Sequence, residues 1–248
     1  MTLVYPAHDF DAFLTAVLET WVNRASDQAI WADQGDWFGP EGPCRAVTAD
    51  PDAARRVTEG VSRLAGPLAA RYLGDAFRHR DPGKEAVLTE FVRLCVRHRR
   101  ATLGGLEPAV RETVRRAEAV RSEAHRFLGL TRFTQVSGGW YARIEPDHDV
   151  VGMLTLALGR RMGGDDWMLH DAGRGLAWVC QAGEGRFVRG VELVASVTES
   201  ESAAQALWQR YFATIALPNR IRPDLQRSKM PQKTWKNLVE VPGHLRPR

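Results

Sequence analysis

Side chains that can bind anions, hold metals or transfer protons are concentrated between residues 121 and 174. Arginines, histidines and carboxylates make up this set: Arg121, Glu123, His125, Arg126, Arg132, Arg143, His148, His170, Asp171 and Arg174. Guanidinium groups bind phosphate oxygens in pairs, and a cluster of them is costly unless an anion is present. We therefore interpret the arginines of this segment as a nucleic-acid phosphate site.

An enzyme that acts on a nucleobase or a phosphodiester is the first alternative. His125 or His148 would then be the general acid or base, and Asp171 would orient it. The chain contains no GxGxxG, GxxxxGK[ST], HExxH or GxSxG motif. The absence of these motifs argues against a nucleotide-dependent enzyme and against a serine hydrolase.

A metal site is a further alternative, built from His148, His170 and Asp171 with Asp147 or Asp149. No pair of these residues has a spacing that is diagnostic of metal binding. The competing interpretation is structural, with the two aspartates capping a helix and Asp171 holding a turn. We therefore expect no metal, and we expect no other cofactor.

Aromatic residues are interleaved with the bases of this segment, namely Phe127, Phe133, Trp140 and Tyr141. Such rings could stack on an unpaired or flipped base. Packing in the core is the better interpretation for Phe133 and Trp140. Tyr141, which lies beside arginines, is the more open candidate for contact with a base.

The charge of the 248-residue chain is unevenly distributed. Residues 1–92 hold 9 basic and 14 acidic side chains, whereas residues 93–248 hold 25 basic and 16 acidic ones, a net charge of +9. The tail from Leu217 is also basic and includes Arg220 and Lys233. A basic half favours a polyanionic partner such as DNA, although solvated surface or an arginine-rich genome would give the same excess.

The remaining composition is that of a globular protein of one large domain or two small ones. No apolar run approaches the roughly 18 residues of a transmembrane helix, and the first residues do not resemble a signal peptide. We therefore expect a cytoplasmic location and no membrane partner. Cys44, Cys95 and Cys180 are far apart in the sequence, which predicts buried thiols rather than a disulfide framework.

Amphipathic helices are predicted for most of the first half. Helices are expected from Asp9, Asp50-Pro51 and Asp81-Pro82, with short strands at Leu3–Tyr5 and Cys44–Thr48. The third helix ends in the basic run Arg93–Arg100, which suits the negative end of the helix dipole. The Gly pair in Leu103–Leu106 is the best candidate for a domain boundary, so we expect regions 1–105 and 106–248.

The second half begins with a helix predicted from Pro108 to about Phe127. At 100° per residue, Arg121 falls inside its apolar stripe and His125 at the edge of that stripe. A charge in such a stripe is costly unless it is paired. Arg121 must therefore find a carboxylate or line a polar site.

A β-hairpin follows, with strands Leu130–Val136 and Trp140–Glu145. If Gly138-Gly139 forms the turn, Arg132 pairs with Glu145. One face of the hairpin is then polar and carries Arg132, Thr134, Tyr141, Arg143 and Glu145.

The other predicted elements place the rest of the polar set. They are a buried helix at Val150–Leu158, strands at Trp167–Asp171, Gly175–Cys180 and Arg186–Val188, a helix from Thr198, and a short helix from Met230-Pro231 with Trp235 and Leu238 inward. The resulting fold class is α+β, with a helical N-terminal half packed on a small, mostly antiparallel sheet that has flanking helices.

Several stretches of the chain resemble a family of uncharacterised bacterial proteins associated with DNA metabolism and DNA repair. The matching residues are Asp9–Leu14, Val47–Val57, Glu123–Phe133, Trp140–His148, His170-Asp171 with Arg174, Leu207-Trp208, Tyr211-Phe212, Asn219-Arg220, Leu225-Gln226 and Met230–Lys236. The pattern of this family often has aromatic residues where Leu130 and Arg161-Met162 stand here.

This resemblance implies a context rather than a mechanism. Members of the family look like partners of a radical SAM protein related to spore photoproduct lyase, and the domain occurs fused to a uracil-DNA glycosylase domain. The resemblance therefore implies a DNA-repair accessory protein whose partner enzyme is a separate chain. A scaffold that binds only proteins is the third hypothesis.

Overall fold

The computed structural model describes residues 1–23, 28–33, 35, 39–136, 138–191, 201–202, 204–207, 209, 230 and 232–239. The chain divides into two compact units, Met1–Ser122 and Glu123–Arg248, and each is described by itself. This division falls within one long helix, and the boundary after residue 105 stays a prediction. None of the described helices is both long enough and apolar enough to cross a bilayer.

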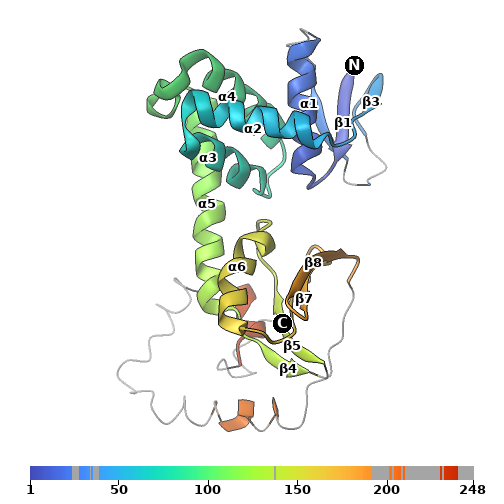
Figure 1. The fold of residues 1–248 in the computed structure, drawn as a ribbon, viewed down its shortest axis with the longest axis vertical. Coiled ribbons are helices and arrows are strands. Elements are labelled where there is room, and N and C mark those ends of the chain that lie inside the picture. Colours follow the sequence, from blue (N-terminus) through green and yellow to red (C-terminus); the bar gives the residue numbers. More distant parts are fainter. Residues whose placement is uncertain are drawn as a thin grey trace. The chain divides into compact units, whose positions relative to one another are not determined.

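The first unit combines helices with a small parallel sheet (Figure 1). The sheet has the order β2-β1-β3 and consists of β1 (Thr2–Pro6), β2 (Ile30–Asp33) and β3 (Cys44–Ala46). The helical elements are α1 (Phe10–Val22), α2 (Pro51–Ala65), α3 (Pro67–Phe77), α4 (Lys84–His98), η1 (Arg99–Gly104) and the first part of α5 (Pro108–Leu130). Strand β2 was not predicted.

The predicted helix starts follow from the capping residues. The side chain of Asp9 accepts a hydrogen bond from the Ala12 N–H, and that of Asp50 accepts from Asp52 and Ala53. These carboxylates satisfy N–H groups that the first turn of a helix leaves without partners. Helix α4 begins two residues after the predicted Pro82, because Gly83 adopts a left-handed conformation with φ +74°.

The apolar stripes of these helices meet in one core. Phe13, Phe91 and Leu73 are completely buried in it, together with Tyr5 of the central strand. The Tyr5 hydroxyl donates a hydrogen bond of 2.8 Å to the buried Glu85 carboxylate. Burial next to this carboxylate raises the pKa of Tyr5, so the phenol stays neutral and satisfies Glu85.

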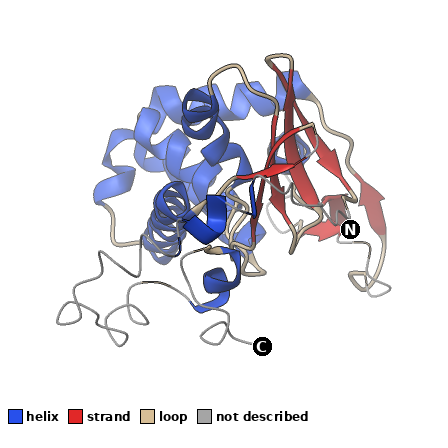
Figure 2. Ribbon diagram, turned by 90° about the horizontal axis from the view of Figure 1, so that it is seen from below, coloured by secondary structure: helices blue, strands red, loops and turns tan. Residues whose placement is uncertain are grey.

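The second unit is built on a mixed five-stranded sheet with the order β4-β5-β6-β7-β8. Figure 2 draws the strands of the chain in red and its helices in blue. Its described elements are β4 (Thr134–Val136), β5 (Gly139–Ile144), α6 (Val151–Met162), β6 (Trp167–Asp171), β7 (Leu176–Gln181), β8 (Glu184–Arg189) and η3 (Gln232–Asn237). Strands β5 and β6 are parallel, and the other neighbouring pairs are antiparallel. The α+β prediction is confirmed.

The predicted hairpin register is wrong by two residues. Val136 pairs with Gly139, so Gly139 belongs to β5 rather than to the turn. A Cβ on Gly139 would lie 2.5 Å from the Asp166 carbonyl oxygen, so only glycine allows this approach to the chain before β6. The predicted pairing of Arg132 with Glu145 is therefore absent, and β4 begins only at Thr134.

The helix predicted at Val150–Leu158 is found as α6, with two differences. Its N-cap residue is Val150, and no side chain caps it, so the predicted capping by Asp147 or Asp149 is wrong. Only the face with Val151, Leu154 and Leu158 is buried, whereas Leu156 is 69% exposed.

The C-terminal predictions are described only in part. Trp235, within η3, and Leu238, directly after it, are buried, which confirms that both point inward. Thr198 and Arg220 lie outside the described residues, as does the side chain of Lys233.

Candidate nucleic-acid interface

Strand register sorts the side chains of the five-stranded sheet into cross-strand rows. One row crosses all five strands through directly paired residues: Thr134, Tyr141, Met168, Val179 and Arg186. The next row on the same face is Arg143, His170, Ala177 and Val188. We call this surface the Tyr141 face, because side chains two residues apart on a strand share a face.

The opposite face of the sheet is the core side. It carries Ala142, Ile144 and Leu169, which are at most 2% exposed. Helix α6 packs against β6 and β7 on this side, with Gly159 next to the Trp167 ring. Every member of the Tyr141 row, by contrast, is at least partly exposed.

Tyr141 and His170 are the polar centre of the Tyr141 face. The Tyr141 hydroxyl and Nδ1 of His170 are joined by a hydrogen bond of 2.8 Å. His170 is only 3% exposed, and its Nε2 makes no hydrogen bond of normal geometry with any described residue, although the Val191 backbone is near the ring. Burial and the charge of Arg143 lower the pKa of His170, which keeps the imidazole neutral near pH 7.

Tyr141 itself is half-buried, and desolvation raises the pKa of its phenol while Arg143 opposes this effect. Arg143 pairs with His170 across the parallel strands. Its guanidinium donates to Oε1 of Glu145 at 2.8 and 3.1 Å, and 46% of its side chain stays exposed. Glu145 thus pairs with Arg143 rather than with the predicted Arg132.

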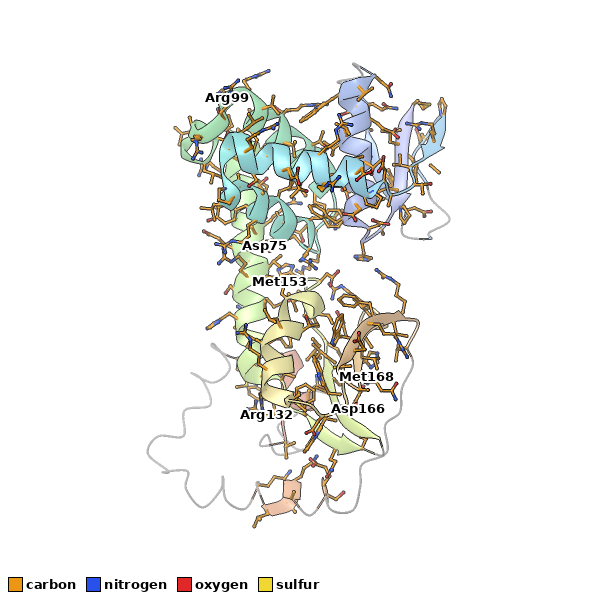
Figure 3. All side chains as sticks on the ribbon, viewed as in Figure 1. Asp75, Arg99, Arg132, Met153, Asp166 and Met168 are labelled. Atoms are coloured by element: carbon orange, nitrogen blue, oxygen red, sulfur yellow. The ribbon has the colours of Figure 1, made fainter. Side chains whose placement is uncertain are left out.

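An open cleft of about 230 Å³ lies over the Tyr141 row. Tyr141, Met168 and Val179 line it, and Asp166 and Gln181 add polar groups (Figure 3 labels Asp166 and Met168). Its volume is below the roughly 300 Å³ at which sites for drug-sized ligands begin. The cleft therefore suits one small planar group rather than a large cofactor.

Asp171 and Arg174 form a clamp at the β6–β7 turn. Arg174 donates to Oδ2 of Asp171 at 2.8 Å and to the carbonyl oxygens of Pro146 and Asp147. Oδ1 of Asp171 accepts from the Gly173 and Arg174 backbone N–H groups. Burial raises the pKa of Asp171 and Arg174 counteracts this shift. These bonds favour a structural role for both residues, and their predicted catalytic and DNA-binding roles stay predictions.

Glu123 fixes the loop before α6. It is 2% exposed, and its two carboxylate oxygens accept the backbone N–H groups of Asp147 at 3.0 Å and His148 at 2.7 Å. His148 is 8% exposed, so this candidate acid or base lies in the interior. His125 and Arg126, by contrast, are exposed on α5.

The two other predicted arginines have partners inside the chain. Nε of Arg121 lies 3.9 Å from Oδ2 of Asp75. Burial raises the pKa of the Asp75 carboxyl, and the charge of Arg121 partly opposes this shift. Arg121 therefore finds a carboxylate, one of the two outcomes expected for a charge in an apolar stripe. Arg132 donates to the Gly129 carbonyl oxygen at 2.7 Å.

The described residues contain no group of three or more histidines, cysteines or carboxylates arranged to hold a metal ion. His148, His170 and Asp171, which the metal hypothesis combined, make separate contacts with Glu123, Tyr141 and Arg174.

Three arginines at the end of α4 and the start of η1, in the first unit, have no ion-pair partner among the described residues. Arg97, Arg99 and Arg100 are exposed and make no ion pair with any described residue, whereas Arg93 lies 3.5 Å from Glu90 and His98 lies 3.4 Å from Glu107. The sequence predicted basic residues here that suit the helix dipole and that belong to the basic half of the chain. It holds no signal for the strained backbone of Arg99 (labelled in Figure 3), whose φ of +52° favours glycine.

The sequence model of a protein family described as a domain of unknown function, DUF4130, matches residues 82–240. The match thus begins just before α4 and includes the Tyr141 face. No curated protein and no solved structure matches the chain.

Proposed function

We propose that the chain, which belongs to the DUF4130 family, is an accessory protein that binds DNA for a separate repair or base-modification enzyme. Binding would be mainly electrostatic, because the family segment lies almost entirely within the part of the chain whose net charge is +9. The resemblance of the sequence points to a radical SAM repair protein or a uracil-DNA glycosylase as the partner enzyme.

The observation that carries this proposal is the group of exposed arginines at 97, 99 and 100, which make no ion pair with a described residue. Exposed arginines in a folded protein often pair with carboxylates, as Arg55 does with Asp52. Arg99 instead holds a strained backbone conformation with no ion-pair partner among the described residues. A cation that is kept at such a position at a cost in stability favours a role in binding. Phosphate oxygens match the fork of donors that a guanidinium presents.

The same criterion applies to the sequence-predicted residues. Arg126 and His125 are exposed, and Arg143 keeps nearly half of its side chain accessible. Arg174 and Arg132 donate to backbone carbonyls, so they are weaker candidates for phosphate contacts. The unpaired Arg97, Arg99 and Arg100 are the stronger candidates in the first unit.

Titration of labelled duplex and single-stranded DNA at several salt concentrations tests the proposal. Log affinity should fall linearly with log salt, with a slope of about −0.9 per phosphate contacted on duplex DNA. Replacement of both Arg97 and Arg100 by alanine should flatten this slope by one to two units, whereas Arg55→Ala, which removes a paired surface arginine, should not. Failure to bind any form of DNA at low salt would refute the proposal. The hypothesis of a scaffold that binds only proteins would then remain.

An enzyme that processes nucleobases is the second candidate, and the Tyr141–His170 pair is the observation that favours it. A proton can be transferred between a phenol and the neutral imidazole to which it is hydrogen-bonded. Base release or base conversion by the purified chain would move this candidate ahead of the accessory role.

A further inference from the structure

We infer that the Tyr141 face is a binding site for single-stranded DNA, in which the ring of Tyr141 stacks on one unpaired base. This inference rests on the proposed DNA binding and adds the form of DNA, the stacking residue and the face. The two features that carry it are the cleft over the Tyr141 row and the two arginines of the Tyr141 face, Arg143 and Arg186.

The ring of Tyr141 is positioned to act as a platform. Its hydroxyl is held by the buried His170, while the half-buried ring lines the cleft. A ring fixed at one end loses little conformational entropy when a base stacks on it. Met168, its direct neighbour on β6, extends the apolar floor. A thioether packs well against an aromatic ring.

The cleft is suited to one base and no more. Its floor is apolar and its edge is polar, with the Asp166 carboxylate and the Gln181 amide available to hydrogen-bond groups on the edge of a base. Oδ1 of Asp166 already accepts from the Ala182 N–H, which fixes the carboxylate in place. Every base has a π face, so stacking of this kind tolerates sequence.

Two arginines on the same face as the cleft supply positive charge for the sugar–phosphate chain. Arg186 ends the Tyr141 row on β8, about 14 Å from Tyr141 at the normal spacing of strands, and makes no ion pair with a described residue. Arg143 lies in the next row of this face, two residues along β5, where it pairs with Glu145 and keeps 46% of its side chain exposed. Bases in a duplex are already stacked and paired, so this arrangement selects a single strand.

The first test compares variants of Tyr141 in binding to a fluorescent oligothymidylate of about 12 nucleotides. Tyr141→Leu should weaken binding by about tenfold or more through the loss of stacking, and Tyr141→Phe, which keeps the ring, should retain most of the affinity. The same oligonucleotide with abasic sites should bind wild type more weakly and should not distinguish Tyr141→Leu from wild type. Equal loss in the Phe and Leu variants, or equal affinity for the abasic strand, would overturn the inference.

The second test uses two arginines of the same strand. Arg186→Ala should weaken binding and lower the salt slope by about 0.7, the value for one phosphate of a single strand. Arg189→Ala is the matched control, since Arg189 is also exposed and makes no ion pair with a described residue but belongs to the core-side face. Equal effects of the two changes would overturn the assignment of the face. This pair also keeps the inference testable if Tyr141→Leu fails to fold.

The two proposals fail in different ways. Binding that is equal for duplex and single strand, and unaffected by Tyr141→Leu, would overturn the inference and preserve the proposed DNA binding. No binding to any DNA would overturn both. Competition by free thymidine monophosphate at the same concentration of nucleotide units would show a mononucleotide site instead. In a positive result, a 5-iodouracil strand should photo-crosslink to Tyr141 or Met168, as mapped by mass spectrometry.

Discussion

The hydroxyl of Tyr141 and Nδ1 of His170 lie 2.8 Å apart on adjacent parallel strands, one side chain half-exposed and the other 3% exposed. The buried histidine thereby sets the orientation of the half-buried Tyr141 ring. Protonation of the His170 ring would change this hydrogen bond, so the orientation of Tyr141 is linked to pH.

Replacement of His170 by asparagine should remove part of the acid sensitivity of the protein. Burial lowers the pKa of His170, so the unfolded chain takes up this proton first as pH falls. The contribution of the neutral imidazole to stability is complete above the unfolded pKa of about 6.5 and is lost as pH falls below it. Thermal melting of wild type and His170→Asn between about pH 8 and pH 5 measures the difference.

Asparagine keeps a polar atom near the position of Nδ1, so the bond to Tyr141 can persist in this variant. The wild-type melting temperature should then fall more steeply with acid than that of the variant. Parallel curves for the two proteins would show that His170 does not titrate differently on folding.

Arg174→Ala should destabilise the second unit by about 3 kcal/mol, because it leaves the completely buried Asp171 without its ion-pair partner. Without Arg174 the already raised pKa of Asp171 should rise further. A carboxyl with a raised pKa loses stability as pH increases, so the defect should be smaller near pH 5 than near pH 8. Denaturant titrations at the two pH values test this. A defect independent of pH would contradict the account of Asp171.

Glu123→Gln should cost about 1–3 kcal/mol, because an amide offers only one accepting oxygen to the N–H groups of Asp147 and His148. The amide nitrogen would also place a donor against a backbone donor. Urea unfolding of the variant measures the cost, and Glu118→Gln, at an exposed position of the same helix, is the control. A loss no larger than that of the control would show that these two bonds contribute little.

Arg99→Gly should raise stability by about 1 kcal/mol and weaken DNA binding at the same time. Glycine relieves the strain of φ +52° but removes a guanidinium. Ala182→Gly is the matched control, since Ala182 also has positive φ, at +50°, in the β7–β8 turn. It should raise the melting temperature without changing the salt slope of DNA binding.

These two opposite effects are measured by thermal melting and by DNA titration on the same samples. Increased stability with unchanged binding in Arg99→Gly would remove this arginine from the proposed interface. Decreased stability would show that its side chain has a structural role.

The sequence predicted most elements, because their signals are local. Asp9, Asp50 and the apolar stripes specify helix starts and buried faces through bonds and contacts a few residues apart. Strand β2 was missed because its pairing with β1 joins residues nearly 30 positions apart. The hairpin register was wrong because Gly139 lies in β5, packed closely against the backbone of Asp166, which is distant in the sequence.

The site residues followed the same rule. The sequence predicted Tyr141 and Arg143 on a shared polar face, and the observed strand places both on one face. It could not show that the carbonyls of residues 146 and 147 bind Arg174, because such partners come from tertiary contacts. The hydrogen bond between His170 and Tyr141 could not be predicted for the same reason.

The hydrogen bond between Tyr5 and Glu85 joins residues on either side of the point where the family match begins, at residue 82. The completely buried Leu88 and Phe91 of α4 share one core with Phe13 and Leu73, which precede that point. The segment that the family model matches therefore shares its core with the residues before it and is not a separate domain in this chain. A protein expressed from residue 82 would expose the apolar face of α4 to solvent and would leave Glu85 without the Tyr5 hydroxyl. The start of the family match and the start of the cooperatively folding unit therefore do not coincide.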